Sequence, residues 1–251
     1  MKKRLSFATL GAAFLLPFLV TPTMAESEAP DSLIPETDIP GTISANIALT
    51  TDYMYRGISQ TSNGNPAVQG GFDYGVGLSE EIGFYLGTWA SNIDFDDGPQ
   101  GGTVEIDYYG GLTGNIQGVD WSLGGLYYQY PGADQSLNYD FIELTAALGY
   151  DFEMVGLAYD FAWSPEFFGE VGDSYYHAFS AGVPLPRGLS LDAGLAYQGF
   201  DLESNDDYWH WTVGLTASVI GFDMTVAYHD ADESDDPLTD ARAVFTIARA
   251  F

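Results

Sequence analysis

Apolar and polar residues alternate along most of the chain after residue 41. Val104, Ile106 and Tyr108 fall on one face of such a segment, while Glu105 and Asp107 fall on the other. The same alternation returns at 68–76, 142–148, 155–161, 189–195, 209–216 and 222–229. A period of two predicts β-strands with one apolar and one polar face. A helical period of 3.6 appears nowhere, so we expect an all-β fold.

The alternation predicts about twelve strands. They span 42–57, 66–78, 82–93, 102–115, 118–130, 139–152, 154–164, 173–183, 188–200, 207–219, 221–230 and 239–251. A tilted strand needs about 9–11 residues to cross a bilayer, whereas strands of soluble domains usually have about five or six. Short turns alternate with longer loops between the strands, as in outer-membrane proteins with short periplasmic turns. We therefore expect a transmembrane antiparallel up-and-down β-barrel at 42–251, with both termini periplasmic.

The residues before the predicted barrel indicate export. Basic residues at 2–4 precede an apolar run from Leu5 to Val20 and a small-residue site that ends at Ala25. This order is typical of a secretory signal peptide, which we assign to residues 1–25. The alternative, a membrane anchor, needs about 20 apolar residues, and Pro17 interrupts this run. Residues 26–41 are rich in proline and acid, which predicts a flexible acidic periplasmic tail.

Composition excludes several classes of function. Removal of the predicted signal peptide leaves four basic residues against 36 acidic ones, a formal charge of −32. Such a chain repels the phosphates of nucleic acid, so we expect no nucleic-acid partner. It has no cysteine, which excludes disulfides, thiol catalysis and cysteine-bound metals. Aromatic residues make up 15% of the sequence, far more than in disordered chains.

Aromatic residues gather near the ends of the predicted strands. They include Tyr53, Tyr55, Tyr127, Tyr128, Tyr130, Trp163, Tyr175, Tyr176, Trp209 and Trp211. Aromatic girdles of this kind mark both surfaces of a membrane, although β-strands of soluble cores also favour aromatic residues. The final residue, Phe251, resembles the terminal aromatic signal of outer-membrane proteins. We expect outer-membrane lipid, lipopolysaccharide and the barrel-assembly machinery as partners, and leave open a homo-oligomer.

Several stretches resemble a known family. They are Leu49–Thr61, Pro66–Tyr74, Gly83–Asn92 and Glu105–Gly110, and they are similar to the TorF family, which is classed among the porins. The resemblance weakens after about Gly132. It implies an outer-membrane porin, but it implies neither a substrate nor particular site residues.

The phase of each strand assigns residues to the interior of the barrel. The proposed pore-lining residues are Asp52, Arg56, Asp73, Glu105, Asp107, Glu143, Asp160, Asp192, Asp223 and Arg242. Rings of carboxylates favour cations over anions, so the hypothesis is a narrow channel for cations or neutral solutes. We expect Arg56 and Arg242 to face each other across the seam between the first and last strands, held by carboxylates such as Asp52 and Asp240. Alternatively, both only neutralise buried acids.

Other functions have weaker support in the sequence. An enzyme would need a nucleophile beside a base, and no serine motif accompanies His177, His210 and His229; a pairing of His210 and His229 with Asp223 is the nearest arrangement. The acidic loops could bind calcium, but none has the spacing of an EF-hand. We predict no catalytic residue, cofactor or metal site. A non-conducting structural barrel or adhesin is the third class.

Overall fold

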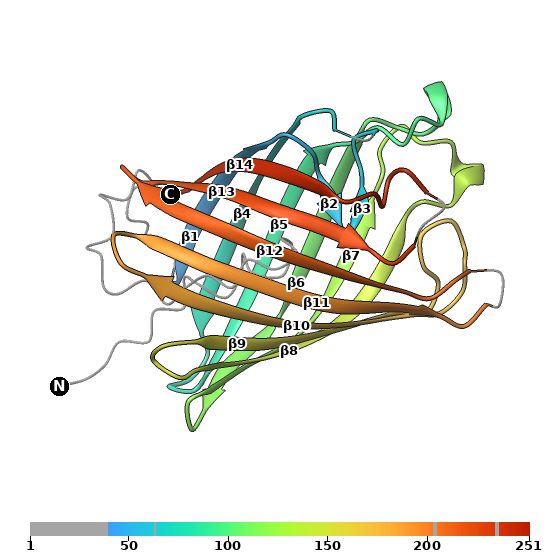
Figure 1. The fold of residues 1–251 in the computed structure, drawn as a ribbon. Helices are drawn as coiled ribbons and strands as arrows, with labels where there is room; N and C mark the ends of the chain where they lie inside the picture. The colour runs from blue at the N-terminus through green and yellow to red at the C-terminus, as the bar shows by residue number, and fades with distance from the viewer. Residues whose placement is uncertain (1–39, 63, 203–204, 234–235) are drawn as a thin grey trace.

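Twelve strands form one closed barrel in the structure, which is a computed structural model (Figure 1). It describes residues 40–62, 64–202, 205–233 and 236–251. The predicted signal peptide and residues 26–39 of the predicted tail lie outside the described residues. All pairs of neighbouring barrel strands are antiparallel, and they follow chain order. The prediction of an all-β up-and-down barrel of about twelve strands is therefore confirmed.

The barrel strands are long, as the alternation predicts. They are β1 (Thr42–Thr50), β4 (Ala67–Gly77), β5 (Ile82–Asn92), β6 (Val104–Ile116), β7 (Val119–Gln129), β8 (Phe141–Asp151), β9 (Gly156–Ser164), β10 (Ser174–Leu185), β11 (Leu189–Phe200), β12 (Tyr208–Val219), β13 (Phe222–Ala231) and β14 (Arg242–Ala250). The remaining elements are the two-residue strands β2 (Met54–Tyr55) and β3 (Ile58–Ser59) and the short 3-10 turns η2 (Gly98–Gln100) and η3 (Gln135–Leu137).

The first and last strands close the barrel. β1 pairs with β14 from Asn46 opposite Ala250 to Thr50 opposite Thr246. The amide of Phe251 extends this ladder by donating to the carbonyl of Ala45 at 2.9 Å. A closed ladder leaves no unpaired strand edge, which is required of strands surrounded by lipid.

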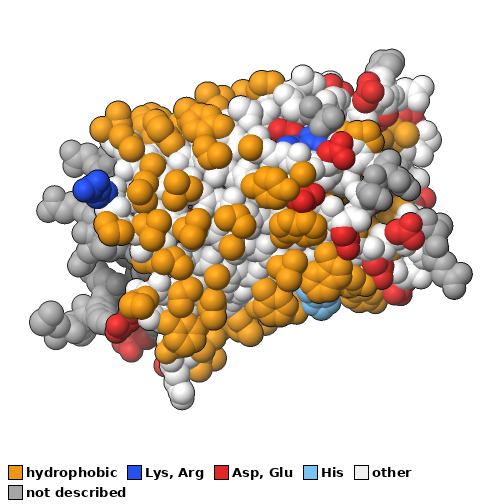
Figure 2. All heavy atoms as spheres, in the orientation of Figure 1, with side chains coloured by type: hydrophobic (Ala, Val, Ile, Leu, Met, Phe, Trp, Pro, Cys, Tyr) orange, Lys and Arg blue, Asp and Glu red, His pale blue; other side chains and the backbone are white. Residues whose placement is uncertain are grey.

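The two faces of the strands differ in the way that the alternation predicts. Large apolar side chains are exposed on the outside, including Phe72 at 64% and Leu49 at 55%. On the inside, Glu105 and Glu143 are almost fully buried. On the face shown in Figure 2, apolar side chains cover the middle of the barrel and most of the acidic ones lie toward one end. Among the described residues, no helix is long and apolar enough to cross a membrane.

Short turns and long loops lie at opposite ends of the barrel, which we name the short-turn end and the long-loop end. Thr42 and Phe251 lie at the short-turn end (Figure 1). At the long-loop end, three loops pack through Phe95, Tyr130, Tyr139 and Phe168, whose rings lie 4.2 to 5.9 Å apart. Partial burial and a hydrogen bond to Asp97 raise the pKa of Tyr139 to about 12. These contacts hold the loops together.

The chain departs from the predicted first strand after Thr50. We predicted one strand over 42–57, but β1 ends at Thr50 and the chain then turns into the barrel. Four of the aromatics assigned to the membrane girdles are buried instead, namely Tyr53, Tyr128, Tyr130 and Tyr176. Because alternation assigns a face only while a strand continues, it could not detect this inward turn.

Candidate functional site in the barrel interior

Residues 52–61 fold into a hairpin inside the long-loop end of the barrel, which we call the inner hairpin. Its two short strands pair Met54 with Ser59 and Tyr55 with Ile58. Arg56 and Gly57 form the two-residue turn at its tip, with φ angles of 48° and 85°. Positive φ at both positions is typical of a type I′ turn, the connection that best fits the twist of a hairpin. The turn therefore presents the Arg56 side chain at the tip.

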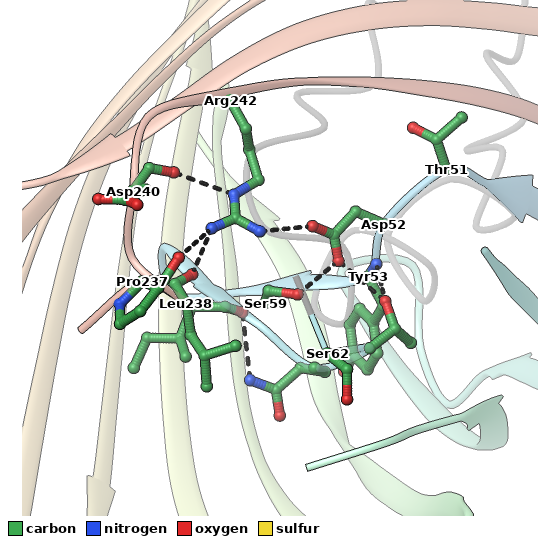
Figure 3. Close-up of polar contacts among 12 residues, drawn as sticks. Thr51, Asp52, Tyr53, Ser59, Ser62, Pro237, Leu238, Asp240 and Arg242 are labelled. Atoms are coloured by element: carbon green, nitrogen blue, oxygen red, sulfur yellow. Dashed lines mark hydrogen bonds and ion pairs between the residues drawn. The ribbon is translucent and has the colours of Figure 1, made fainter. Parts of the chain in front are cut away.

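The base of the inner hairpin is fixed to the barrel wall through Asp52 (Figure 3). One carboxylate oxygen of Asp52 accepts hydrogen bonds from Ser59 Oγ at 2.7 Å and Thr61 Oγ1 at 2.8 Å, within the hairpin itself. The other oxygen pairs with Arg242 Nη1 at 2.8 Å. Arg242 begins β14, so this ion pair joins the base of the hairpin to the last strand.

Arg242 is also held by backbone carbonyls of the loop before β14. Its Nη2 donates to Pro237 O at 2.7 Å and Leu238 O at 3.0 Å, and its Nε donates to Asp240 O at 2.9 Å. The amide of Ser59 donates to Leu238 O at 2.9 Å. The loop, the last strand and the base of the hairpin thus form one connected hydrogen-bond network (Figure 3).

The tip of the inner hairpin reaches strands remote from β1. Arg56 Nη2 pairs with Glu143 Oε2 on β8 at 2.8 Å, and Nη1 donates to Gln198 Oε1 on β11 at 2.8 Å. The guanidinium lies 4.1 Å from the ring centre of Tyr176 on β10, a cation–π contact. Both side chains of the Arg56–Glu143 pair are less than a tenth exposed. The tip therefore crosses the interior and bridges the opposite wall.

An aromatic and acidic cluster lies beside the hairpin. Tyr53 donates from its hydroxyl to Glu105 Oε1 at 2.7 Å and packs edge-on against Trp89, with ring centres 5.4 Å apart. The hydroxyl of Tyr128 donates to Glu143 Oε2 at 3.1 Å. Asp107 lies on the same inward face as Glu105 and is 1% exposed.

The structure gathers six of the ten predicted pore-lining residues at the long-loop end and leaves four elsewhere. The six are Asp52, Arg56, Glu105, Asp107, Glu143 and Arg242. The other four lie nearer the middle or the short-turn end: Asp73 accepts from Tyr109, Asp192 from Ser190 and Asp223 from Ser218, while Asp160 is half-buried. That all ten line a conducting pore stays a prediction.

The expected meeting of the two arginines at the seam is wrong. Arg242 does pair with Asp52 there, but Arg56 lies across the interior against Glu143. Asp240 contributes its backbone carbonyl to Arg242. The physical reason is the type I′ turn, which carries Arg56 away from the wall that β1 occupies.

Neither does the structure assemble the histidine pairing that an enzyme would use. His210 is buried beside the hydroxyl of Tyr176, at 3.1 Å, and His229 is paired in the ladder with Arg242 near the long-loop end. Asp223 lies at the start of β13, close to the short-turn end. Among the described residues, no group of three histidine or acidic side chains is arranged to hold a metal ion.

The predicted site residues do not include Gln198 and Tyr176, although both side chains contact Arg56 at the tip of the inner hairpin. Gln198 shares the inward face of β11 with Asp192, so its phase alone could have placed it inside. Tyr176 was assigned to the girdle because of its residue type, although it shares the inward face of β10 with the buried Ala178. A residue's place in the alternation of its strand thus predicts better than its residue type whether its side chain lies in this site.

The chain belongs to the family Gcw_chp, described as a bacterial protein of unknown function, which matches residues 35–250. No curated protein matches it. This family match does not specify the TorF family, so that resemblance stays a prediction.

Solved structures with a similar fold include outer-membrane channels. The KdgM porin covers 83% of this chain and 99% of its own, with a TM-score of 0.54 and 7% identity. An outer-membrane channel from Pseudomonas putida F1 covers 89% of this chain and 100% of its own, with a TM-score of 0.52 and 14% identity. The NanC porin covers 83% and 98%, with a TM-score of 0.51 and 5% identity. At these identities the likeness shows the fold.

Proposed function

We propose that the protein is an outer-membrane porin that forms a narrow channel for small polar solutes or ions, with cations or neutral solutes favoured. Its apolar exterior suits lipid, and its charged interior suits water. The likeness of the fold to the KdgM and NanC porins and the resemblance to the TorF family support the same conclusion. In this proposal the long loops face outward and both termini are periplasmic.

The observation that carries the proposal is the charged hairpin inside a closed barrel. Barrels of about eight strands are filled by their own side chains, whereas those with sixteen or more leave a wide aqueous channel. Twelve strands lie between these limits, and here the inner hairpin occupies part of the interior. We infer that the hairpin sets the width of the channel, because its tip spans from β1 to β8 and β11.

The charges of the interior support a preference for cations. Both inward arginines are already paired, Arg56 with Glu143 and Arg242 with Asp52. Among the described residues, no arginine lies within salt-bridge distance of Glu105, Asp107, Asp160 or Asp192. A surplus of carboxylates lowers the energy of a cation and raises that of an anion along the path.

The same barrel suits the proposed partners. Its apolar belt contacts outer-membrane lipid, and its long loops contact lipopolysaccharide. The barrel-assembly machinery recognises Phe251. Phe251→Ala keeps the backbone hydrogen bonds to Ala45, so it should lower the amount of folded protein in the outer membrane through loss of the aromatic ring, as measured by heat-modifiable gel migration. An unchanged amount would contradict that role for the terminal residue.

Planar bilayers containing the purified, refolded protein test the channel directly. We expect discrete conductance steps and a reversal potential on the cation side under a KCl gradient. Liposome swelling with neutral sugars of increasing size would then give the size limit. Correctly folded protein that gives neither current nor swelling would refute the channel.

A further inference from the structure

Asp107 is a buried carboxylate without a hydrogen-bond partner. It is 1% exposed, and within the described part of the chain neither of its carboxylate oxygens has a hydrogen-bond partner. Its neighbours across the ladder are Trp89 on β5 and Tyr128 on β7. Burying an unpaired charge is unfavourable, so such a side chain is neutralised either by a proton or by a positive partner, and it is a candidate site for a cation.

A second buried oxygen points to the same missing partner. Glu143 uses Oε2 for Arg56 and Tyr128, but its Oε1 is buried and has no partner among the described residues. Tyr128 connects the two sites, since it pairs with Asp107 in the ladder and donates to Glu143. Glu105, two residues before Asp107 on the same face, accepts a hydrogen bond from Tyr53. Three carboxylates thus share a region that contains one guanidinium.

We propose that Asp107 binds a monovalent cation in the barrel interior, with Glu105 and Glu143 supplying additional negative charge. The class is monovalent because, in the described part of the chain, Asp107 and one oxygen of Glu143 are the unpartnered acidic oxygens of this region, whereas Ca²⁺ takes about six to eight oxygen ligands. The inference rests on the proposed function, since the cation would reach Asp107 through the channel. It makes Asp107 the binding site behind the preference for cations.

The inner hairpin links this site to the shape of the channel. Tyr53 and Arg56 belong to the hairpin, and they contact Glu105 and Glu143, the other two acids of the cluster. Neutralising Asp107 lowers the repulsion between these three acids, and so the cation stabilises the seated hairpin.

Thermal unfolding of the full protein in detergent tests the site without requiring conductance. We compare unfolding temperatures in KCl and in N-methylglucamine chloride at equal ionic strength, because the large organic cation does not fit a buried site. The wild type should unfold at a higher temperature in KCl. D107N should unfold at the same temperature in both salts, whereas D96N, an exposed loop residue at positive φ that asparagine tolerates, should retain the difference.

The results of these experiments test the cation site and the channel independently. Equal unfolding temperatures of the wild type in both salts, or a difference retained by D107N, would overturn the cation site. If D107N does not refold, thallium NMR of the wild type replaces it: a bound resonance that K⁺ displaces supports the site, and its absence overturns it. A wild type that binds K⁺ but conducts no current would refute the channel and leave the site standing.

Discussion

The two ends of the inner hairpin are held by ion pairs of equal length but in different surroundings. At the base, Arg242 and Asp52 pair at 2.8 Å, and three backbone carbonyls from a single loop complete the arginine's contacts. At the tip, Arg56 and Glu143 pair at 2.8 Å, and the guanidinium also contacts the side chains of Gln198 and Tyr176 on other strands. The base is therefore an attachment to the nearby wall, whereas the tip is a bridge across the interior.

This difference separates two roles that a single loop combines. The base contacts keep the hairpin inside the barrel, and they involve neighbours of β1 in the closed ladder. In the proposed channel, the tip contacts place a charge where a solute would pass. Variants of the base should therefore change stability and hairpin position, and variants of the tip should change conductance and selectivity.

The largest effect should come from removing the tip while keeping the base. Residues 55–58 can be replaced by Gly-Gly, because Met54 and Ser59 face each other in the hairpin ladder and Ser59, which binds Asp52 at the base, is kept. We expect single-channel conductance to rise by roughly severalfold, since the interior of a twelve-strand barrel widens when its filling is removed. An unchanged conductance would show that the hairpin does not limit the path.

The next largest effect should follow from breaking the base. Asp52→Ala leaves Arg242 without its carboxylate partner and removes two hydrogen bonds within the hairpin. Loss of one partner from a buried pair costs about 3 kcal/mol of unfolding free energy. Urea unfolding measures this change, with Glu80→Ala, an exposed residue of ordinary backbone conformation in a short turn, as the control. A loss no greater than the control's would mean that Asp52 does not hold the hairpin.

The charges of the tip should shift selectivity in opposite directions. Arg56→Gln removes the positive charge, so the reversal potential should move further toward the cation limit. Glu143→Gln removes the negative charge and should move the reversal potential toward zero. Both variants remove the same ion pair, so each controls for the other's loss of stability. A shift in the same direction for both would indicate a change of shape rather than of charge.

How much of this molecule the sequence predicts depends on whether a residue lies in a strand. Alternation placed Glu105, Asp107 and Glu143 on the inward face correctly, because a residue's phase is fixed by its neighbours along the same strand. It placed Tyr53 outward, although Tyr53 is 4% exposed inside the barrel. The chain leaves the ladder at Thr50, and beyond that point phase carries no information about direction.

For a related reason, the carboxylate partner of Arg242 could be predicted and that of Arg56 could not. Arg242 lies in the ladder, and its partner Asp52 was among the carboxylates expected near it. Arg56 lies at a turn, where the pairing with Glu143 depends on a contact between residues 87 positions apart. The Arg56-Gly57 sequence is a weak turn signal, since asparagine or aspartate before glycine is the usual one for type I′.

The smallest effect should come from Gly57→Ala, which tests how tightly the tip is seated. A Cβ at Gly57, where φ is +85°, would lie 2.7 Å from the Cβ of His210. Gly64 is the matched control, because its φ of +113° carries a conformational cost but a Cβ there meets nothing within 4 Å. The positive φ should cost each variant about 1 kcal/mol in urea unfolding. Gly57→Ala alone should also raise conductance, because the clash with β12 displaces the tip while the Asp52–Arg242 pair holds the base. Equal behaviour of the two variants would mean that the tip is not packed against the far wall.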